Sequence, residues 1–324
     1  MRSKTSLKFE TAFHRDVYQG LTDNPKHISS KYFYDERGDR LFQDIMAMPD
    51  YYLTRAELQI FDANKTDICR HFMGEGQFFH QIELGAGDGK KTKILLRHLW
   101  EQQALFKYQP IDISHNALTH LKQSIHKELP EVQVETKAGT YFETLKELNN
   151  LQHDRKVLLF LGSNIGNLLH PQAVEFLVRL QGLMREDDLL FIGFDQKKNP
   201  RKILDAYNDP EGITEAFNKN VLLRMNKELG ANFNPEAFLH WEVYDPESGT
   251  ARSFLVSIKR QTVFIKNLDL TVSFNPWETI HTEISQKYDD TIIHWLAEKA
   301  GLEPVEHYTD TQASYKNFLF RKRS

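Results

Sequence analysis

The sequence has little of what marks several large classes of protein. One cysteine, Cys69, among 324 residues excludes an intrachain disulfide framework. No apolar run approaches the length that spans a bilayer, so we expect no membrane partner. The formal net charge is −4, whereas a general nucleic-acid binder would be basic, so we expect no nucleic-acid partner. The N-terminal stretch MRSKTSLKFETAF lacks the apolar centre of a signal peptide, and we therefore expect a soluble, cytoplasmic monomer.

Metal-binding patterns are also lacking, although the chain contains 14 histidines. There is no H-E-x-x-H sequence and no pair of cysteines. His115, His120 and His126 lie in a polar stretch that is typical of a helix surface. The sequence therefore predicts no structural metal.

What the chain does have is an alternation of short apolar strands with amphipathic helices between residues 61 and 195. Helical spacing of apolar residues occurs at 91–103 and 171–184. This alternation predicts an α/β fold with a parallel sheet covered on both faces. The expected strands are 78–84, 108–113, 157–162 and 188–195.

The pattern changes after residue 195. A helical stretch broken at Pro210 and Gly212 precedes a hairpin whose turn contains Pro246 and Gly249. A helix at 289–302 and a strand at 315–322 then return to the earlier pattern, and they could complete the sheet. We therefore expect two lobes with a ligand cleft between them. The expected lobes are residues 61–195 plus 286–324, which would bind the cofactor, and residues 1–60 plus 196–285, which would bind the substrate.

The stretch ELGAGDGKK follows the first expected strand with three glycines at every second position, Gly85, Gly87 and Gly89. Neither the phosphate-binding P-loop nor the dinucleotide pattern fits, because Lys90 stands where the last glycine of G-x-G-x-x-G belongs. What remains is an acidic residue, Glu83, ahead of G-x-G-x-G. That spacing resembles motif I of the class I S-adenosylmethionine-dependent methyltransferases. Bare backbone here would let the ribose and amino-acid tail of that cofactor approach closely.

Two further strand ends carry polar residues, and ligands in α/β sheets bind at the carboxyl ends of strands. Asp112 ends the second expected strand, where a carboxylate can accept hydrogen bonds from both ribose hydroxyls. The alternative is that Asp112 caps a helix. The stretch FLGSNIGNLL similarly suits either contact with a substrate or a helix cap followed by a turn. Its polar or small residues are Gly162, Ser163, Asn164 and Asn167.

The stretch HTEISQKY, residues 281–288, alternates with the period of a strand, so Glu283, Ser285 and Lys287 share one face. A carboxylate and a hydroxyl side by side could bind a small polar ring or an amine, and the alternative is a solvated strand face. Several tyrosines allow a similar choice between a site and a core position with the hydroxyl at the surface. These are Tyr34, Tyr51, Tyr52 and Tyr207.

Six motifs, in this order and spacing, resemble the histidine-specific N-alpha-methyltransferases of ergothioneine biosynthesis, from about residue 20 to the C-terminus. They are KYFYDERGDRLFQDI, MPDYYLTRAE, ELGAGDGKKT, FLGSNIGN, AYNDPEGITEAFNKNVL and TEISQKY. The resemblance implies a Rossmann-like class I methyltransferase sheet and a second, α+β substrate lobe formed by the N-terminus and an insertion. It also implies three methyl transfers from S-adenosylmethionine to the alpha-amine of L-histidine, which give hercynine.

The resemblance also implies roles for residues of the cofactor site. Gly85, Lys91 and Asp112 would contact S-adenosylmethionine, with Gly162 nearby. The family often has an Asp-Phe pair at the positions of Thr140 and Tyr141, where the aspartate would contact the adenine amino group. In this chain that contact would fall to Thr140 or to a backbone group.

For the substrate, the resemblance implies that Asn167 and Tyr207 hold the histidine carboxylate. Tyr51, Glu283 and Ser285 would bind the imidazole. Tyr34 would lie beside the amine and the transferred methyl group as the catalytic residue. Ser253 stands where a larger apolar residue can line the imidazole pocket, which leaves room for a wider pocket and a broader amino-acid preference.

Three other functions stay open. The chain could methylate a different free amino acid, although Glu283 and Ser285 argue against a purely apolar ring. It could be a catalytically silent methyltransferase fold that binds metabolites or a protein. A nicotinamide-dependent dehydrogenase is disfavoured by Lys90.

Overall fold

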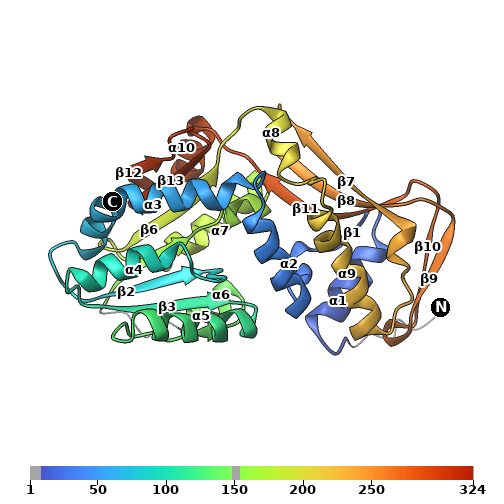
Figure 1. Cartoon of the computed structure of the whole chain (residues 1–324), viewed down its shortest axis with the longest axis horizontal. Helices are drawn as coiled ribbons and strands as arrows, with labels where there is room; N and C mark the ends of the chain where they lie inside the picture. Colours follow the sequence, from blue (N-terminus) through green and yellow to red (C-terminus); the bar gives the residue numbers. More distant parts are fainter. Residues whose placement is uncertain (1–8, 148–153, 324) are drawn as a thin grey trace. The chain divides into compact units, whose positions relative to one another are not determined.

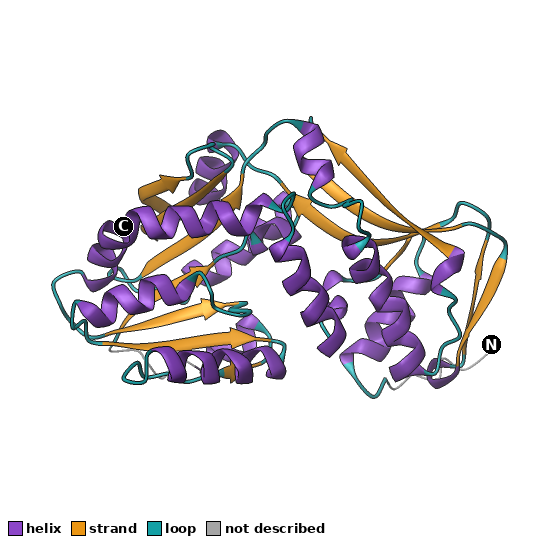
Figure 2. Cartoon of the chain, viewed as in Figure 1, coloured by secondary structure: helices purple, strands orange, loops and turns teal. Residues whose placement is uncertain are grey.

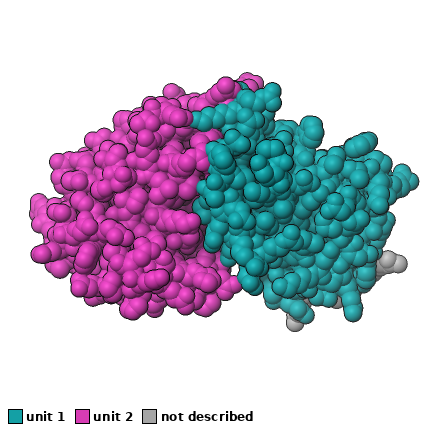
Figure 3. Space-filling model, viewed as in Figure 1, with its two compact units in different colours: residues 1–50, 200–245, 251–284 teal, residues 51–199, 246–250, 285–324 magenta. Residues whose placement is uncertain are grey.

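The computed structural model describes residues 9–147 and 154–323, and its contacts divide the chain into two compact units (Figure 3). Unit 1 contains residues 1–50, 200–245 and 251–284, and unit 2 contains residues 51–199, 246–250 and 285–324. The first boundary lies at residue 50 rather than at the expected residue 60. The reason is that α3 (Tyr52–Met73) is one continuous helix, which packs against the helices and strands of unit 2.

Unit 2 contains a seven-stranded sheet in the order β12-β13-β6-β5-β2-β3-β4 (Figure 1). The strands from β6 to β4 are parallel, and β13 runs antiparallel to β6. The predicted parallel sheet is confirmed, and so is its completion by the C-terminal strand. The strands are β2 (Phe79–Leu84), β3 (Phe106–Asp112), β4 (Lys137–Ala138), β5 (Arg155–Phe160), β6 (Leu189–Asp195), β12 (Leu302–Thr309) and β13 (Tyr315–Lys322).

Helices cover both faces of this sheet (Figure 2). Leu177 of α7 and Leu296 of α10 belong to the buried cluster on one face, and Leu96 of α4 and Leu121 of α5 belong to the cluster on the other. Because both faces are buried, every residue of β6 is buried and the strand, LLFIGFD, is apolar along most of its length. The remaining helices of unit 2 are α4 (Thr92–Glu101), α5 (His115–Glu128), α6 (Tyr141–Glu147), α7 (His170–Gln181), α10 (Asp290–Lys299) and the short η3 (Asn164–Asn167).

The strand order reverses between β2 and β5, since β2 is followed by β3 on one side and paired with β5 on the other. In open parallel sheets a ligand binds at the carboxyl ends of the strands where this reversal occurs. The loops that leave β2 and β5 at that edge begin at Gly85 and Leu161.

Unit 1 contains a four-stranded sheet, β1-β11-β8-β7, and a separate hairpin, β9-β10. The predicted hairpin is β7 and β8, and the residues between them include Pro246 and Gly249. The predicted interruption of the helical stretch is also present, because α8 ends at Asp205 and α9 begins at Ile213. The strands are β1 (Lys26–His27), β7 (Phe238–Asp245), β8 (Thr250–Ser257), β9 (Gln261–Ile265), β10 (Leu270–Phe274) and β11 (Thr279–Gln286). The helices are α1 (Ala12–Thr22), η1 (Ser30–Phe33), α2 (Glu36–Ala47), α8 (Pro200–Asp205), α9 (Ile213–Leu229), η4 (Pro235–Ala237) and η5 (Lys266–Leu268).

None of the helices in the described ranges is both long enough and apolar enough to cross a membrane.

Candidate functional site

The loop after β2 has the backbone geometry that requires its glycines. Gly85, Gly87 and Gly89 have φ angles of +74°, +54° and +64°, a region that other L-residues seldom adopt. A Cβ on Gly85 would lie 2.8 Å from the hydroxyl oxygen of Tyr141, whereas a Cβ on Gly87 would meet open space among the described atoms. The loop therefore leaves bare backbone accessible at Gly87.

Asp112, at the end of β3, is tied to this loop. Its Oδ2 accepts a hydrogen bond from the Gly87 N–H at 3.1 Å, and its Oδ1 accepts one from the Ser114 N–H at 2.9 Å. The cap of α5 is Ser114, whose hydroxyl oxygen accepts from Ala117, so the helix-cap alternative for Asp112 is wrong. Burial raises the pKa of Asp112, and the N–H groups of Ser114 and Gly87 oppose that rise.

Glu83 lies within the core at the end of β2. Its carboxylate accepts hydrogen bonds from the hydroxyls of Tyr108 and Thr92, the latter at 2.8 Å. Burial raises the pKa of Glu83 to about 7, although both hydroxyls act to lower it. Each carboxylate oxygen of Glu83 is hydrogen-bonded to a side chain of the protein. This geometry favours a role for Glu83 in supporting the glycine loop rather than in contacting a cofactor.

Glu57 of α3 is a buried carboxylate that was not predicted from the sequence as a site residue. It joins the segment after β2 to the loop after β5. It pairs with the Lys91 ammonium and accepts a hydrogen bond from the Gly162 N–H at 2.9 Å. Its other oxygen accepts from Asn317 at 2.8 Å and from the Tyr315 hydroxyl at 3.2 Å. Two predicted cofactor residues, Lys91 and Gly162, are therefore fixed by one side chain from outside both loops.

The turn after β5 brings further predicted residues to the same edge. Ser163 has φ +58°, and its hydroxyl oxygen accepts a hydrogen bond from the Asp195 N–H at 3.1 Å. A Cβ on Gly85 would lie 2.8 Å from Nδ2 of Asn164, so the loops after β2 and β5 touch. Asn167, at the end of η3, is exposed.

Thr140 and Tyr141 lie at the start of α6. Thr140 is exposed, and its hydroxyl donates to Glu143. Tyr141 places its ring against Phe160, with 5.6 Å between centroids, and burial raises the pKa of its hydroxyl. Tyr141 is therefore the one of this pair that contacts the glycine loop, since its hydroxyl lies over Gly85.

Among the predicted substrate residues of unit 2, Tyr51 caps the start of α3 and is 8% exposed. Ser285 is also 8% exposed, and Lys287 is completely buried. The Lys287 ammonium donates to the Ser285 hydroxyl oxygen at 2.6 Å. The alternative of a solvated strand face is therefore wrong for Ser285 and Lys287.

Unit 1 holds Tyr34 and Tyr207. Tyr34 is partly buried, and its ring meets Phe217 and Phe42 edge-on, with centroids 5.4 and 5.5 Å away. Tyr207 is 6% exposed, and its backbone carbonyl accepts a hydrogen bond from His240 at 3.0 Å.

Ser253 on β8 lies next to Glu283. Its hydroxyl donates to Oε2 of Glu242 on β7 at 2.6 Å, and its oxygen lies 3.3 Å from Oε2 of Glu283. Ser253 is only 1% exposed, so its small side chain is packed and bonded. Glu242, which was not predicted from the sequence as a site residue, accepts the hydrogen bond of the Ser253 hydroxyl.

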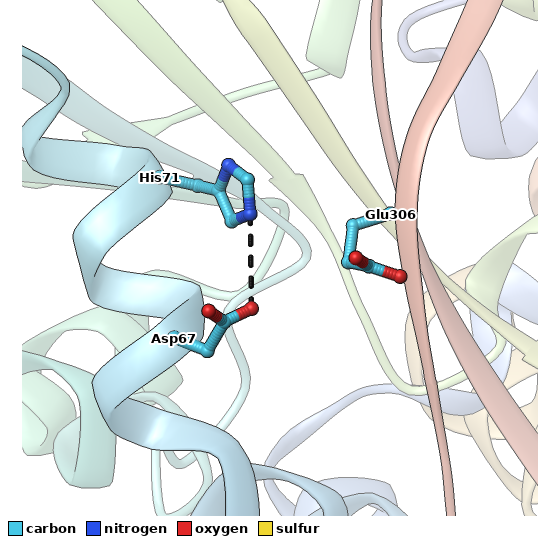
Figure 4. Close-up of side chains that lie close together, drawn as sticks. All are labelled: Asp67, His71 and Glu306. Atoms are coloured by element: carbon cyan, nitrogen blue, oxygen red, sulfur yellow. Dashed lines mark ion pairs between the residues drawn. The ribbon is translucent and has the colours of Figure 1, made fainter.

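Two other features of the described residues have some of the properties of a binding site. Asp67, His71 and Glu306 bring three possible metal ligands within 4.8 Å of one another (Figure 4). Asp67, however, already pairs with Arg70 and His71 and accepts a hydrogen bond from the Tyr308 hydroxyl at 2.6 Å, so its carboxylate has protein partners without a metal.

A cavity of about 410 Å³ lies in unit 1. Its lining includes His27, Arg252, Phe254 and His281, and none of its lining residues is a predicted site residue. The cavity therefore does not coincide with the site that the sequence indicates.

Residues 13–322 match the model of a family described as histidine-specific methyltransferase, SAM-dependent. The chain belongs to this family. It is 34% identical over 304 residues to the histidine N-alpha-methyltransferase of Mycobacterium tuberculosis, with 94% of this chain and 93% of that protein covered. It is 33% identical to the enzyme of the same name from Mycolicibacterium smegmatis, with the same coverage. Ergothioneine biosynthesis protein 1 of Schizosaccharomyces pombe is 29% identical, with 91% of this chain and 39% of that protein covered.

As a histidine-specific methyltransferase, this chain uses S-adenosylmethionine, and the edge of its sheet suits that cofactor. The open space over Gly87 leaves room for a group against bare backbone. Asp112 lies beside that backbone with its carboxylate at the loop. An acidic side chain in this place can bind the hydroxyls of a ribose.

Proposed function

We propose that the chain transfers methyl groups from S-adenosylmethionine to the alpha-amine of L-histidine. Three transfers would give the trimethylated betaine hercynine, the first step of ergothioneine biosynthesis. The observation that carries this proposal is the match to the histidine-specific family over residues 13–322, which span both units. The two mycobacterial relatives, each similar over nearly its whole length, support the same substrate.

For the cofactor, we assign direct contact to Gly85, Gly87, Lys91, Asp112 and Gly162. When bound, S-adenosylmethionine supplies a methyl group that its sulfonium already activates. The Asp112 carboxylate would accept from the ribose hydroxyls. Through Glu57, Lys91 and Gly162 would be held in place before the cofactor arrives.

Four further residues of the predicted cofactor set receive other roles. Gly89 is a supporting residue, because a Cβ there would lie 2.2 Å from Cδ1 of Leu121. Glu83 supports the loop through Thr92. Thr140 and Tyr141 would flank the adenine, with the Thr140 backbone in the place of the missing aspartate.

For the substrate, the proposed roles keep to the family resemblance. Asn167 and Tyr207 would hold the carboxylate of histidine, and Tyr51, Glu283 and Ser285 would bind the imidazole. A carboxylate that faces a ring N–H makes a charge-assisted hydrogen bond, which gives Glu283 the largest share of selectivity. Tyr34 would lie beside the amine as the catalytic residue.

The work left to the protein is mainly to hold a neutral amine in line with the methyl group. An amide and a phenol bind the substrate carboxylate without placing another cation near the sulfonium. The product carries a fixed positive charge, which the face of a tyrosine ring attracts. These residue types therefore suit repeated methylation of one nitrogen.

The test is incubation of the protein with S-adenosylmethionine and each free amino acid in turn, followed by mass spectrometry. We expect L-histidine to give products with one, two and three added methyl groups. Phenylalanine should give none, because the polar groups that bind imidazole would be left unpaired. Faster methylation of a different amino acid would support the second candidate, an alpha-N-methyltransferase of other specificity. Cofactor binding with no turnover of any amino acid would instead indicate a silent fold.

The expectation of a cytoplasmic monomer belongs to this proposal, since a free amino acid and a free cofactor need no macromolecular partner. Light scattering coupled to size-exclusion chromatography would test the monomer directly.

A further inference from the structure

Lys287 lies directly after β11 and is completely buried. Its ammonium lies 2.6 Å from the hydroxyl oxygen of Ser285 and 2.8 Å from Oδ2 of Asp195. We propose that Lys287 is a positioning residue that fixes the Ser285 hydroxyl as a hydrogen-bond donor toward the substrate ring. The inference rests on the proposed function, because it requires Ser285 to face the imidazole.

The chemistry of the two groups sets the direction of this hydrogen bond. An ammonium has only hydrogens to give, whereas a hydroxyl has one hydrogen and two lone pairs. Lys287 therefore donates, and one lone pair of Ser285 accepts. The hydroxyl hydrogen of Ser285 must point away from Lys287, toward another acceptor.

Asp195, the carboxylate that pairs with Lys287, is also completely buried. Burial alone would raise the pKa of Asp195, but the ammonium groups of Lys287 and Lys198 lower it below its ordinary value. The Tyr52 hydroxyl lies 2.8 Å from Oδ2 of Asp195 and donates to the same carboxylate. The Asp195 carboxylate is therefore a second acceptor for the Lys287 ammonium, beside the Ser285 hydroxyl oxygen.

The same cluster restrains the position of Lys287. Asp195 ends β6, and its backbone N–H donates to the Ser163 hydroxyl oxygen at 3.1 Å. Lys198 pairs with Asp195 and lies over the Tyr52 ring, 4.2 Å from its centroid. Because Lys287 is held by groups from several segments of unit 2, its ammonium cannot turn away from Ser285 at low cost.

This arrangement defines which form of the ring fits. Glu283 and Ser285 are two residues apart on β11, so their side chains leave the same face of the strand. Glu283 offers an acceptor, and Ser285 offers a donor. A neutral imidazole has one N–H and one bare nitrogen and complements both, whereas imidazolium has an N–H at both positions. Lys287 therefore selects neutral rings that carry one donor and one acceptor nitrogen.

A double-mutant cycle between Lys287 and Ser285 tests the inference, with binding of L-histidine measured by calorimetry in the presence of S-adenosylhomocysteine. Methionine at position 287 keeps the length of the side chain but cannot donate. We expect Lys287→Met to weaken histidine binding about ten-fold, as for the loss of one aligned hydrogen bond in a buried site. In a Ser285→Ala background, the same change should have little further effect. Lys287→Arg, which still only donates, should recover part of the affinity.

The pH dependence of histidine affinity gives a second measurement, which would not change if Lys287 had only a structural role. As pH is lowered from about 8 to about 5.5, wild-type affinity should fall because the imidazole becomes protonated near its usual pKa of about 6.5. Lys287→Met should show a shallower fall, because its Ser285 hydroxyl can turn and accept from imidazolium. Equal pH dependence in the two proteins, or additive effects in the double-mutant cycle, would overturn the inference.

A paired variant, Lys287→Met with Asp195→Asn, distinguishes loss of the Ser285 hydrogen bond from loss of folding. It removes both members of the ion pair, so neither is left as an unpaired buried charge. This variant should show the same shallow pH dependence, and a wild-type slope in it would also count against Lys287. If wild-type protein methylates histidine but the cycle shows no coupling, only this inference fails. If wild-type protein does not methylate histidine, the proposed function itself fails.

Discussion

The carboxylate of Asp112 accepts a hydrogen bond from the backbone of Gly87, with 3.1 Å between Oδ2 and N. This contact joins the end of β3 to the middle of the glycine loop. The group that would bind the ribose therefore also holds the loop against which the cofactor would lie. Loop geometry and cofactor affinity should respond together when this carboxylate changes.

We expect Asp112→Asn to weaken binding of S-adenosylhomocysteine by about ten- to one hundred-fold. An amide can still accept from Gly87, but it loses the charge that strengthens hydrogen bonds to ribose hydroxyls, worth about 1.5–3 kcal/mol. Isothermal titration calorimetry measures the affinity. The matched control is Glu131→Gln, an exposed acid after α5 whose carboxylate accepts from Trp100. Equal affinities for the Asp112 variant and the wild type would remove Asp112 from the cofactor site.

Substitutions of Gly87 and Gly89 should have different effects, because the space around the two glycines differs. Gly87→Ala adds a methyl group in open space, so we expect a loss of stability of only about 1–2 kcal/mol from the positive φ, with a much larger loss of cofactor affinity. Gly89→Ala drives its methyl group to 2.2 Å from Leu121 and should instead lower the melting temperature strongly. Thermal melts with and without S-adenosylhomocysteine distinguish the two. A Gly87→Ala protein that gains the full ligand-induced shift in melting temperature would contradict the proposed contact.

Much of unit 2 could be predicted from the sequence, because its parallel strands are short apolar runs between turns. β2, β3, β5 and β6 lie within about two residues of their predicted positions, as expected when both faces of a sheet are buried. β12 was missed. It is an edge strand that carries Pro304 and exposed acids such as Glu306, so its sequence has no apolar pattern, and only pairing with β13 defines it.

The residues of the candidate site likewise fall into those that the sequence predicts and those that it does not. The glycine loop and Asp112 are visible because each requirement is local, a positive φ or the end of a strand. Glu57 could not be predicted from the sequence. The partners that make its burial possible are Tyr315 and Asn317, which lie 258 and 260 residues further along the chain. Likewise, the neighbour of Ser253 is Glu242 on another strand, and no pattern in the sequence indicates that contact.

Glu283 should control histidine affinity separately from cofactor affinity. We expect Glu283→Gln to weaken L-histidine binding by about ten- to one hundred-fold, because a neutral amide replaces a charged acceptor, while affinity for S-adenosylhomocysteine stays within about two-fold. Glu236→Gln is a suitable control, since Glu236 is an exposed acid in unit 1. Calorimetry with each ligand gives both numbers. Parallel losses for the two ligands would indicate a general disturbance rather than a contact with the substrate.

Glu83 should make stability depend on pH in a direction opposite to that of most paired acids. Burial raises its pKa in the folded protein to about 7, from an ordinary value of 4.5. Between these two values the unfolded chain releases the proton first and so binds fewer protons than the folded chain. The free energy of unfolding therefore falls as pH rises through this window, by up to about 1.4 kcal/mol per pH unit, and the loss is complete above the folded pKa.

Glu83→Gln removes this titration and keeps the shape of the side chain. Its amide oxygen can accept from Tyr108, and its NH₂ can donate to the Thr92 hydroxyl oxygen. Relative to wild type, the variant should therefore gain stability steadily from about pH 5 to about pH 8. Urea unfolding of both proteins across this range measures the difference, in which the titrations of all other groups cancel. A difference that is flat with pH would mean that the Glu83 carboxyl titrates near its ordinary value, and one that shrinks would mean that the folded state stabilises the charged form.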